Sequence, residues 1–209
     1  ARDRFYAFDK RTGEPVWSST PGVAPKDSSF STPVFETRDG KRVFYAGTGC
    51  GNVVCINARN GEAFWRYQFS KGGVNSTLAI EGDQLVCVHG KENMDTAEEG
   101  RMIALRLPDQ LGGGEQVVLS DSAEQWRLPL VSFSSSPALH GGRAYVLTKT
   151  GTLACVEVKS GKLLWDKKLD SSNLHSSVLY VNGVLVAPMQ SGKLVIVKPG
   201  DEDAEILHE

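Results

Sequence analysis

The sequence of 209 residues lacks any apolar run close to the roughly 20 residues that a membrane-spanning helix needs. It also lacks a basic cluster, because its 23 lysines and arginines are dispersed and the formal net charge is −2. A nucleic-acid-binding protein would carry a concentrated positive patch. We therefore expect neither a membrane-spanning helix nor nucleic-acid binding in this chain.

Cysteine is scarce, and none of the four copies belongs to a C-x-x-C pair. Cys55, Cys87 and Cys155 lie inside apolar runs, where cysteine packs as a small hydrophobe. Cys50 lies in a glycine turn and could form a disulfide with Cys55 or with a partner, although packing is the favoured interpretation. The four histidines have no spacing suited to a metal. The sequence therefore predicts no metal site, no cofactor and no catalytic residues.

Tryptophan is also rare, and its positions are informative. Three of the four tryptophans end a Gly-x-x-x-Trp element, at Gly13–Trp17, Gly61–Trp65 and Gly161–Trp165. Trp126 lies where a fourth copy would fall, after a segment that has gained residues. Recurrence at a regular interval indicates a repeat architecture.

Each repeat contains four short apolar runs separated by turns. A run such as Val53–Ile56 precedes each Gly-x-x-x-Trp element, and a Ser/Thr pair opens the next run after each tryptophan. Glycine-containing turns separate the runs, as in β-hairpins. Repeats of roughly 40 to 50 residues with four strands each are typical of propeller blades, and no window shows a helical period. We therefore predict an all-β fold, a β-propeller of four-stranded antiparallel blades.

The repeat predicts a single partial propeller of four to five blades over residues 1–209. Its predicted units are a partial blade over 1–20, blades over 30–69, 75–130 and 134–170, and a last unit over 174–209. Ile206 takes the place of the expected tryptophan, so the last unit is expected to be degenerate or frayed. A chain that opens within a blade is expected to be a trimmed fragment, so the missing signal peptide says little about its compartment.

The segment Ala7–Trp17 resembles the tryptophan-docking repeat of pyrroloquinoline-quinone (PQQ)-like β-propellers, Ala-x-Asp-x-x-x-Gly-x-x-x-Trp. The first copy matches all four positions, whereas the copies ending at Trp65 and Trp165 keep only the glycine and the tryptophan. A small residue and a glycine leave room for the indole to lie against the backbone, so the tryptophans should clamp blade to blade. The expected docking residues are Gly13, Trp17, Gly61, Trp65, Trp126, Gly161 and Trp165.

The resemblance implies one of two functional branches. PQQ-dependent dehydrogenases carry an adjacent cysteine pair, a Ca²⁺ site and a catalytic aspartate, and this chain has no adjacent cysteines. The other branch contains non-enzymatic propellers, among them the lipoprotein of the outer-membrane β-barrel assembly machinery. The resemblance to that branch implies a bacterial, periplasmic or otherwise extracytoplasmic scaffold that binds a protein or senses a ligand. The alternatives are a fragment of a quinoprotein dehydrogenase and the sensor domain of a larger regulatory protein.

Four residues directly precede the Ser/Thr pairs, namely Phe30, Asn75, Ser134 and His175. In a propeller the loops that enter the innermost strands surround the mouth of the central channel. We therefore expect these four residues, the channel-mouth set, to face one another and to be candidate contacts for a ligand or partner. A solvated rim is the alternative.

Two insertions interrupt the repeat, at Lys91–Gly100 and Pro108–Ser122. They should emerge on opposite faces, because they connect strands two to three and three to four of one blade. Acidic and glycine-rich loops are more often mobile than functional, so mobile loops are the favoured interpretation.

Open ends would expose uncovered blade faces. We therefore expect either contraction into a closed ring, with the last unit on Phe5–Trp17, or a homodimer through the open ends.

Overall fold

A computed structural model describes residues 3–209 as five β-sheets in which consecutive strands pair antiparallel, with one added parallel strand in the second sheet. Ala1 and Arg2, which begin the predicted partial blade, lie outside the described residues. The first sheet contains β1 (Phe5–Phe8) and β2 (Pro15–Ser19). The second sheet contains β3 (Val34–Arg38), β4 (Lys41–Gly47), β5 (Asn52–Asn57) and β6 (Ala63–Gln68).

The remaining three sheets have four strands each. The third sheet contains β7 (Ala79–Glu81), β8 (Gln84–Glu92), β9 (Glu99–Arg106) and β11 (Glu124–Leu128). The fourth sheet contains β12 (Ala138–His140), β13 (Arg143–Leu147), β14 (Thr152–Glu157) and β15 (Leu163–Lys168). The fifth sheet contains β16 (Leu179–Val181), β17 (Val184–Pro188), β18 (Leu194–Pro199) and β19 (Ala204–His208). The prediction of an all-β fold is confirmed.

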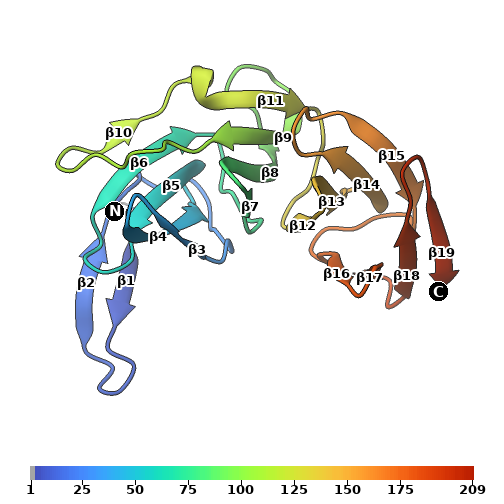
Figure 1. Cartoon of the computed structure of the whole chain (residues 1–209), viewed down its shortest axis with the longest axis horizontal. Coiled ribbons are helices and arrows are strands. Elements are labelled where there is room, and N and C mark those ends of the chain that lie inside the picture. Colours follow the sequence, from blue (N-terminus) through green and yellow to red (C-terminus); the bar gives the residue numbers. More distant parts are fainter. Residues whose placement is uncertain (1–2) are drawn as a thin grey trace.

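The sheets stand side by side in an arc, with β3, β7, β12 and β16 toward its concave side (Figure 1). Successive strands of each sheet step outward, as in the blades of a β-propeller. Four apolar clusters fill the four junctions between neighbouring sheets. Strands β4, β5, β8 and β14 are buried along most of their length because a sheet covers them on each side. The fold is therefore a partial β-propeller.

The tryptophans share one register within their sheets. Each lies opposite a small residue of the neighbouring strand, and the ladder shifts beside the pair. The pairs are Ala7–Trp17, Cys55–Trp65, Ala104–Trp126 and Cys155–Trp165. The small residue leaves space for the indole, as the sequence predicts.

The fifth sheet corrects one position in this pattern. Ile196 lies opposite His208, whereas Ile206 lies opposite Val197. His208, not Ile206, therefore holds the tryptophan position. The reason is that Pro199 and Ala204 continue the pairing toward the turn, which lengthens this hairpin. The strand is not frayed, since β19 pairs with β18 along its length.

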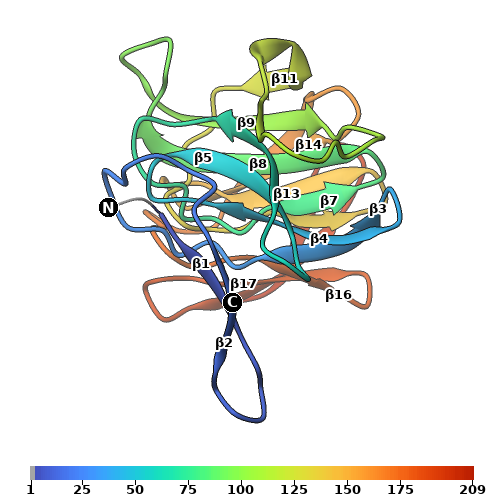
Figure 2. The ribbon, with the colours of Figure 1, turned by 90° about the vertical axis from the view of Figure 1, so that its left-hand side faces the viewer.

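The expected contraction into a closed ring is wrong. Strands β1 and β2 pair only with each other, and β19 pairs only with β18, within residues 3–209. The two end sheets lie at opposite ends of the arc in Figure 1. Viewed onto the first sheet, the β1–β2 turn points away from the body of the molecule (Figure 2).

The two insertions are more ordered than the sequence suggests. Strands β8 and β9 extend through Glu92 and from Glu99, so only a short loop of the Lys91–Gly100 insertion remains. Within Pro108–Ser122, strand β10 (Val117–Val118) pairs in parallel with β6 as a fifth strand of the second sheet. A single 3-10 turn, Asp121–Ala123, then leads into β11. These paired segments are therefore strands where the sequence predicted loops, and the mobility of the insertions stays a prediction.

Candidate functional site

The four predicted docking tryptophans, Gly61 and Gly161 lie at the junctions between sheets, whereas Gly13 lies in the end sheet with no side chain over it among residues 3–209. The ring of Trp17 covers Gly61 of the next sheet, where an added Cβ would lie 2.6 Å from a ring carbon. Trp126 covers Gly161 in the same way, at 2.5 Å. A side chain at either glycine would collide with the indole. These residues are therefore clamps between sheets.

The indole N–H groups add a polar contact to three of the four clamps. Trp17 donates to the Ala58 carbonyl at 3.3 Å, and Trp126 donates to the Val158 carbonyl at 2.7 Å. Trp165 donates to the Gly200 carbonyl at 3.0 Å. The buried N–H of Trp65 has no partner among the described residues.

The Trp65 junction differs because the third sheet has lost its docking glycine. The longer connection Pro108–Ser122 replaces the Gly-x-x-x-Trp turn there. Trp65 instead packs in a cluster with Leu107 and Leu111, and β10 runs beside it. Apolar contacts and a strand thus take the place of the glycine.

The channel-mouth set is only partly brought together. Ser134 and His175 form a hydrogen bond of 2.9 Å between Oγ and Nδ1. The Phe30 side chain is 69% exposed, and Asn75 is half-buried with its Oδ1 unpaired. Within residues 3–209 no hydrogen bond joins these two residues to Ser134 or His175. The structure therefore supplies one polar pair at this position.

The Ser/Thr pairs beside this set form a ladder that the sequence analysis missed. The Thr32 amide donates to Thr77 Oγ1 at 3.2 Å, and the Thr77 amide donates to Ser136 Oγ at 2.9 Å. The Ser136 amide donates to Ser177 Oγ at 2.9 Å. Each step crosses from one sheet to the next. The signal was present in the repeated hydroxyl residues, but their partners lie 41 to 59 residues away in the sequence.

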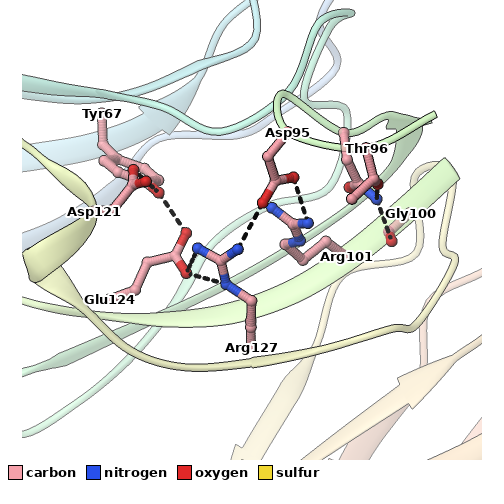
Figure 3. Close-up of polar contacts among 9 residues, drawn as sticks. Tyr67, Asp95, Thr96, Gly100, Arg101, Asp121, Glu124 and Arg127 are labelled. Atoms are coloured by element: carbon pink, nitrogen blue, oxygen red, sulfur yellow. Dashed lines mark hydrogen bonds and ion pairs between the residues drawn. The ribbon is translucent and has the colours of Figure 1, made fainter. Parts of the chain in front are cut away.

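Charged and polar contacts run from the shorter insertion of the third sheet along its outer strand toward the longer one (Figure 3). Asp95, in the shorter loop, accepts from Arg101 at 2.6 Å and from Arg127 at 2.7 Å. Arg127 also bonds Glu124 at 2.7 Å, and Tyr67 donates to Glu124. The Arg101 contact holds the pKa of Asp95 below its usual range. The insertions therefore form an ordered surface.

Tyr67 Oη also lies 3.3 Å from Asp121 of the longer insertion, so polar contacts through the outer strand link the two insertions, which the sequence placed on opposite faces. We call Lys91–Gly100 together with Pro108–Ser122 the insertion surface. The first segment has one lysine against four carboxylates, and the second has three carboxylates and no basic residue. Three large apolar side chains, Met94, Val117 and Val118, are exposed by 46%, 54% and 57%. Exposed apolar groups on an ordered, charged surface are typical of an interaction site.

A half-open cleft of about 330 Å³ lies between the third and fourth sheets. Its lining combines Leu130, Ala154 and Leu163 with the hydroxyl groups of Thr148 and Thr150. These hydroxyls bond each other at 2.9 Å, and Lys149 and Asp166 also line the cleft. The cleft has room for an apolar side chain or a small molecule.

The described residues contain no cluster of acidic, histidine or cysteine side chains arranged to hold a metal ion. All four cysteines are free and buried, so the alternative of a Cys50–Cys55 disulfide is not realised. Burial raises the pKa of Cys55 to about 12 and that of Cys155 to about 11. Their thiols therefore pack as apolar groups. Within residues 3–209, no helix has the length and apolar character needed to cross a membrane.

Comparison with known proteins shows the family to which the chain belongs. The family model described as outer membrane protein assembly factor BamB matches residues 1–106 and 113–207. The gap between these ranges falls at the start of the second insertion.

Two curated relatives carry the same description. The protein from Moranella endobia (strain PCIT) is 22% identical over 200 residues, which cover 93% of this chain and 46% of the relative. The protein from Alteromonas naphthalenivorans is 26% identical over 113 residues, covering 51% of this chain and 25% of the relative. The chain thus spans half or less of the length of these relatives.

One solved structure has a similar fold, and its low sequence identity supports a statement about the fold only. A europium-containing methanol dehydrogenase matches with a TM-score of 0.59 at 15% identity, covering 93% of this chain and 44% of that chain.

Proposed function

Because the chain belongs to the family of the outer membrane protein assembly factor BamB, a family of PQQ-like propellers, we propose that it is a non-catalytic scaffold that binds a protein partner. We propose for it a role in outer-membrane protein assembly, which the family's description supports. We place this role in the periplasm, as the resemblance of the repeat to that branch of the propellers implies. The binding site on this chain is our proposal.

The insertion surface carries the proposal. Asp95 ties the shorter loop to Arg101 and Arg127, and β10 ties the longer loop to β6. A partner would therefore meet the exposed Met94, Val117 and Val118 without having to order the loops first. Since both insertions carry excess negative charge, the partner segment should be apolar and basic.

A binding measurement tests this proposal. An outer-membrane β-barrel protein unfolded in urea is diluted into buffer that contains the labelled chain, and its binding to the chain is measured. We expect saturable binding that weakens by tenfold or more in the double variant Met94→Asp, Val118→Asp. Leu179→Asp is the matched control, because Leu179 is also exposed, by 61%, but lies on the fifth sheet. Equal loss in both variants would show that the insertion surface is not the site.

The non-catalytic part of the proposal has its own test. We expect addition of PQQ with Ca²⁺ to leave the melting temperature unchanged, and no dye-linked alcohol oxidation to appear. A rise in melting temperature or measurable oxidation would instead support the dehydrogenase alternative.

A further inference from the structure

The cleft between the third and fourth sheets is bounded by one face of the fourth sheet. Ala154 of this face is buried in the apolar cluster against which Trp126 packs. Asp166 lies opposite Ala154 in the pairing of β14 with β15, and residues that lie opposite each other point to the same face. Lys168 lies opposite Thr152 and belongs to this face for the same reason. The face therefore combines a small apolar residue with a carboxylate and an ammonium group.

The same positions of the second sheet carry longer side chains. Counted from the tryptophan of each sheet, Val54 corresponds to Ala154, and Arg66 corresponds to Asp166. The Arg66 guanidinium donates to the Asn52 amide oxygen at 3.1 Å, so the polar groups of that face bond each other. The fourth sheet has shorter side chains at these positions, and a cleft of about 330 Å³ lies beside them.

The two charged side chains of this face have no ionic partner within residues 3–209. The Asp166 carboxylate takes part in no hydrogen bond or ion pair there. Lys168 donates to the Thr150 carbonyl and meets no carboxylate among the same residues. Lys149 also lines the cleft, but its Nζ lies 3.6 Å from a carboxylate oxygen of Glu99. One negative and one positive group are therefore available to a ligand.

The rest of the lining supplies hydroxyl groups and apolar surface. The Thr150 hydroxyl lies 2.9 Å from that of Thr148 and 3.3 Å from that of Thr152. Leu130 and Leu163 contribute apolar side chains from the two sides of the cleft. Pockets for small molecules measure about 300–1,000 Å³, so this cleft fits a ligand at the small end of that range.

We propose that this cleft binds a free α-amino acid with an aliphatic side chain. The ammonium group of the ligand pairs with Asp166, its carboxylate pairs with Lys168, and its side chain lies on Leu130 and Ala154. Residues two apart on a strand are about 7 Å apart, so the two charges of one α-amino acid can bridge them. A ligand with a single charge would leave the other protein group unpaired, whereas a zwitterion satisfies both.

This inference goes beyond the proposed function. The residues that line the cleft lie outside both segments of the insertion surface. The Met94→Asp, Val118→Asp variant should therefore bind the amino acid within twofold of the parent. The two proposals can fail separately.

L-leucine is the probe, and its binding to the full ¹⁵N-labelled chain is measured by calorimetry and by NMR. We expect saturable binding, with amide shifts at Thr150, Ala154 and Asp166. Three further ligands each lack one feature: 4-methylpentanoate lacks the ammonium group, L-leucinamide lacks the carboxylate, and glycine lacks the side chain. Each should bind at least tenfold more weakly. The proposal is overturned if any of them binds as tightly as L-leucine, or if L-leucine gives no saturable shift.

Variants that remove a charge connect each ligand group to its residue. Asp166→Asn should weaken L-leucine binding at least tenfold and bring it within twofold of 4-methylpentanoate binding. Lys168→Met should likewise bring L-leucine within twofold of L-leucinamide. Asp166→Asn should keep the melting temperature of the parent, because the Asp166 side chain holds no polar contact within residues 3–209.

Glu202→Gln is the matched control. Glu202 is exposed in the turn between β18 and β19, away from the cleft, so its variant should bind L-leucine within twofold of the parent. Unchanged binding in Asp166→Asn, or an equal loss in Glu202→Gln, would contradict the proposal. If Asp166→Asn weakened binding of the unfolded β-barrel protein while L-leucine did not bind, the cleft would hold a partner's side chain instead, and the proposal would be wrong.

Discussion

Glycines with nearly the same backbone conformation serve different purposes in this chain. Gly61 and Gly142 have φ values of 76° and 77°, in the left-handed region that glycine adopts without strain. Gly61 lies under the Trp17 ring, whereas an added Cβ at Gly142 would meet nothing within 4 Å among residues 3–209. The difference between the two positions is therefore packing and not backbone strain.

This pair yields a stability prediction. Alanine at either position costs about 1–2 kcal/mol in backbone strain. Gly61→Ala should cost about 1–3 kcal/mol more, because the Trp17 ring must move. Denaturant unfolding of both variants measures the difference in the free energy of unfolding. Equal losses would mean that Trp17 is not clamped on Gly61.

His89 provides a second prediction at the residue scale. Burial lowers its pKa to about 4, and the nearby positive charge of Arg101 acts in the same direction. Its Nδ1 accepts from the Lys91 amide, and its Nε2 has no partner among the described residues. The imidazole is therefore neutral in the folded chain at neutral pH.

The pH dependence follows from that shift. An unfolded histidine titrates near 6.5, so between about pH 6.5 and 4 the unfolded chain binds the proton that the folded chain excludes. As the pH is lowered through this window, the free energy of unfolding should fall by up to about 1.4 kcal/mol per pH unit. His89→Gln should flatten the slope of unfolding free energy against pH from 7 to 4. An unchanged slope would show that other groups cause it.

At the scale of elements, β10 is the feature that the sequence did not reveal. Val117 and Val118 follow three glycines and are too few to give a strand pattern. Their partner, β6, lies about 50 residues earlier and pairs with them in parallel, without a connecting turn to indicate it. Such long-range pairing depends on three-dimensional proximity that only the folded chain supplies.

Hydrogen exchange tests whether β10 is a stable strand. The Leu119 amide donates to the Arg66 carbonyl at 2.9 Å, next to the paired residues. We expect this amide to exchange at least about tenfold more slowly than that of Gly113 in the same insertion. If the two amides exchange at similar rates after correction for their intrinsic exchange rates, the whole insertion is mobile.

Other elements could be predicted because their signals are local. The glycine turns and the small residue opposite each tryptophan fix the hairpins of the second and fourth sheets. The fifth sheet shows the limit, since a longer hairpin moved the tryptophan position from Ile206 to His208. The charged contacts of Asp95 and Glu124 were missed for a similar reason: they join strands and loops that are distant in sequence.

At the scale of the whole molecule, the arc leaves its two end sheets apart (Figure 1). The apolar face of β1 and β2 is exposed at one end, and Leu179 and Leu194 of the fifth sheet are exposed at the other. The homodimer through these ends stays a prediction. Head-to-tail contact between two such unlike faces gives a closed ring if the rotation between copies closes, and open chains of molecules if it does not.

The junctions between sheets also set the geometry of the arc. The tryptophans join neighbouring sheets along the outer strands, and the ladder from Thr32 to Ser177 joins them where the chain enters the inner strands. From the second sheet to the fifth, neighbouring sheets are therefore attached at two different distances from the centre of the arc, which restricts rotation of one sheet against the next. We expect these attachments to hold the curvature of the arc and so the distance and angle between its two ends.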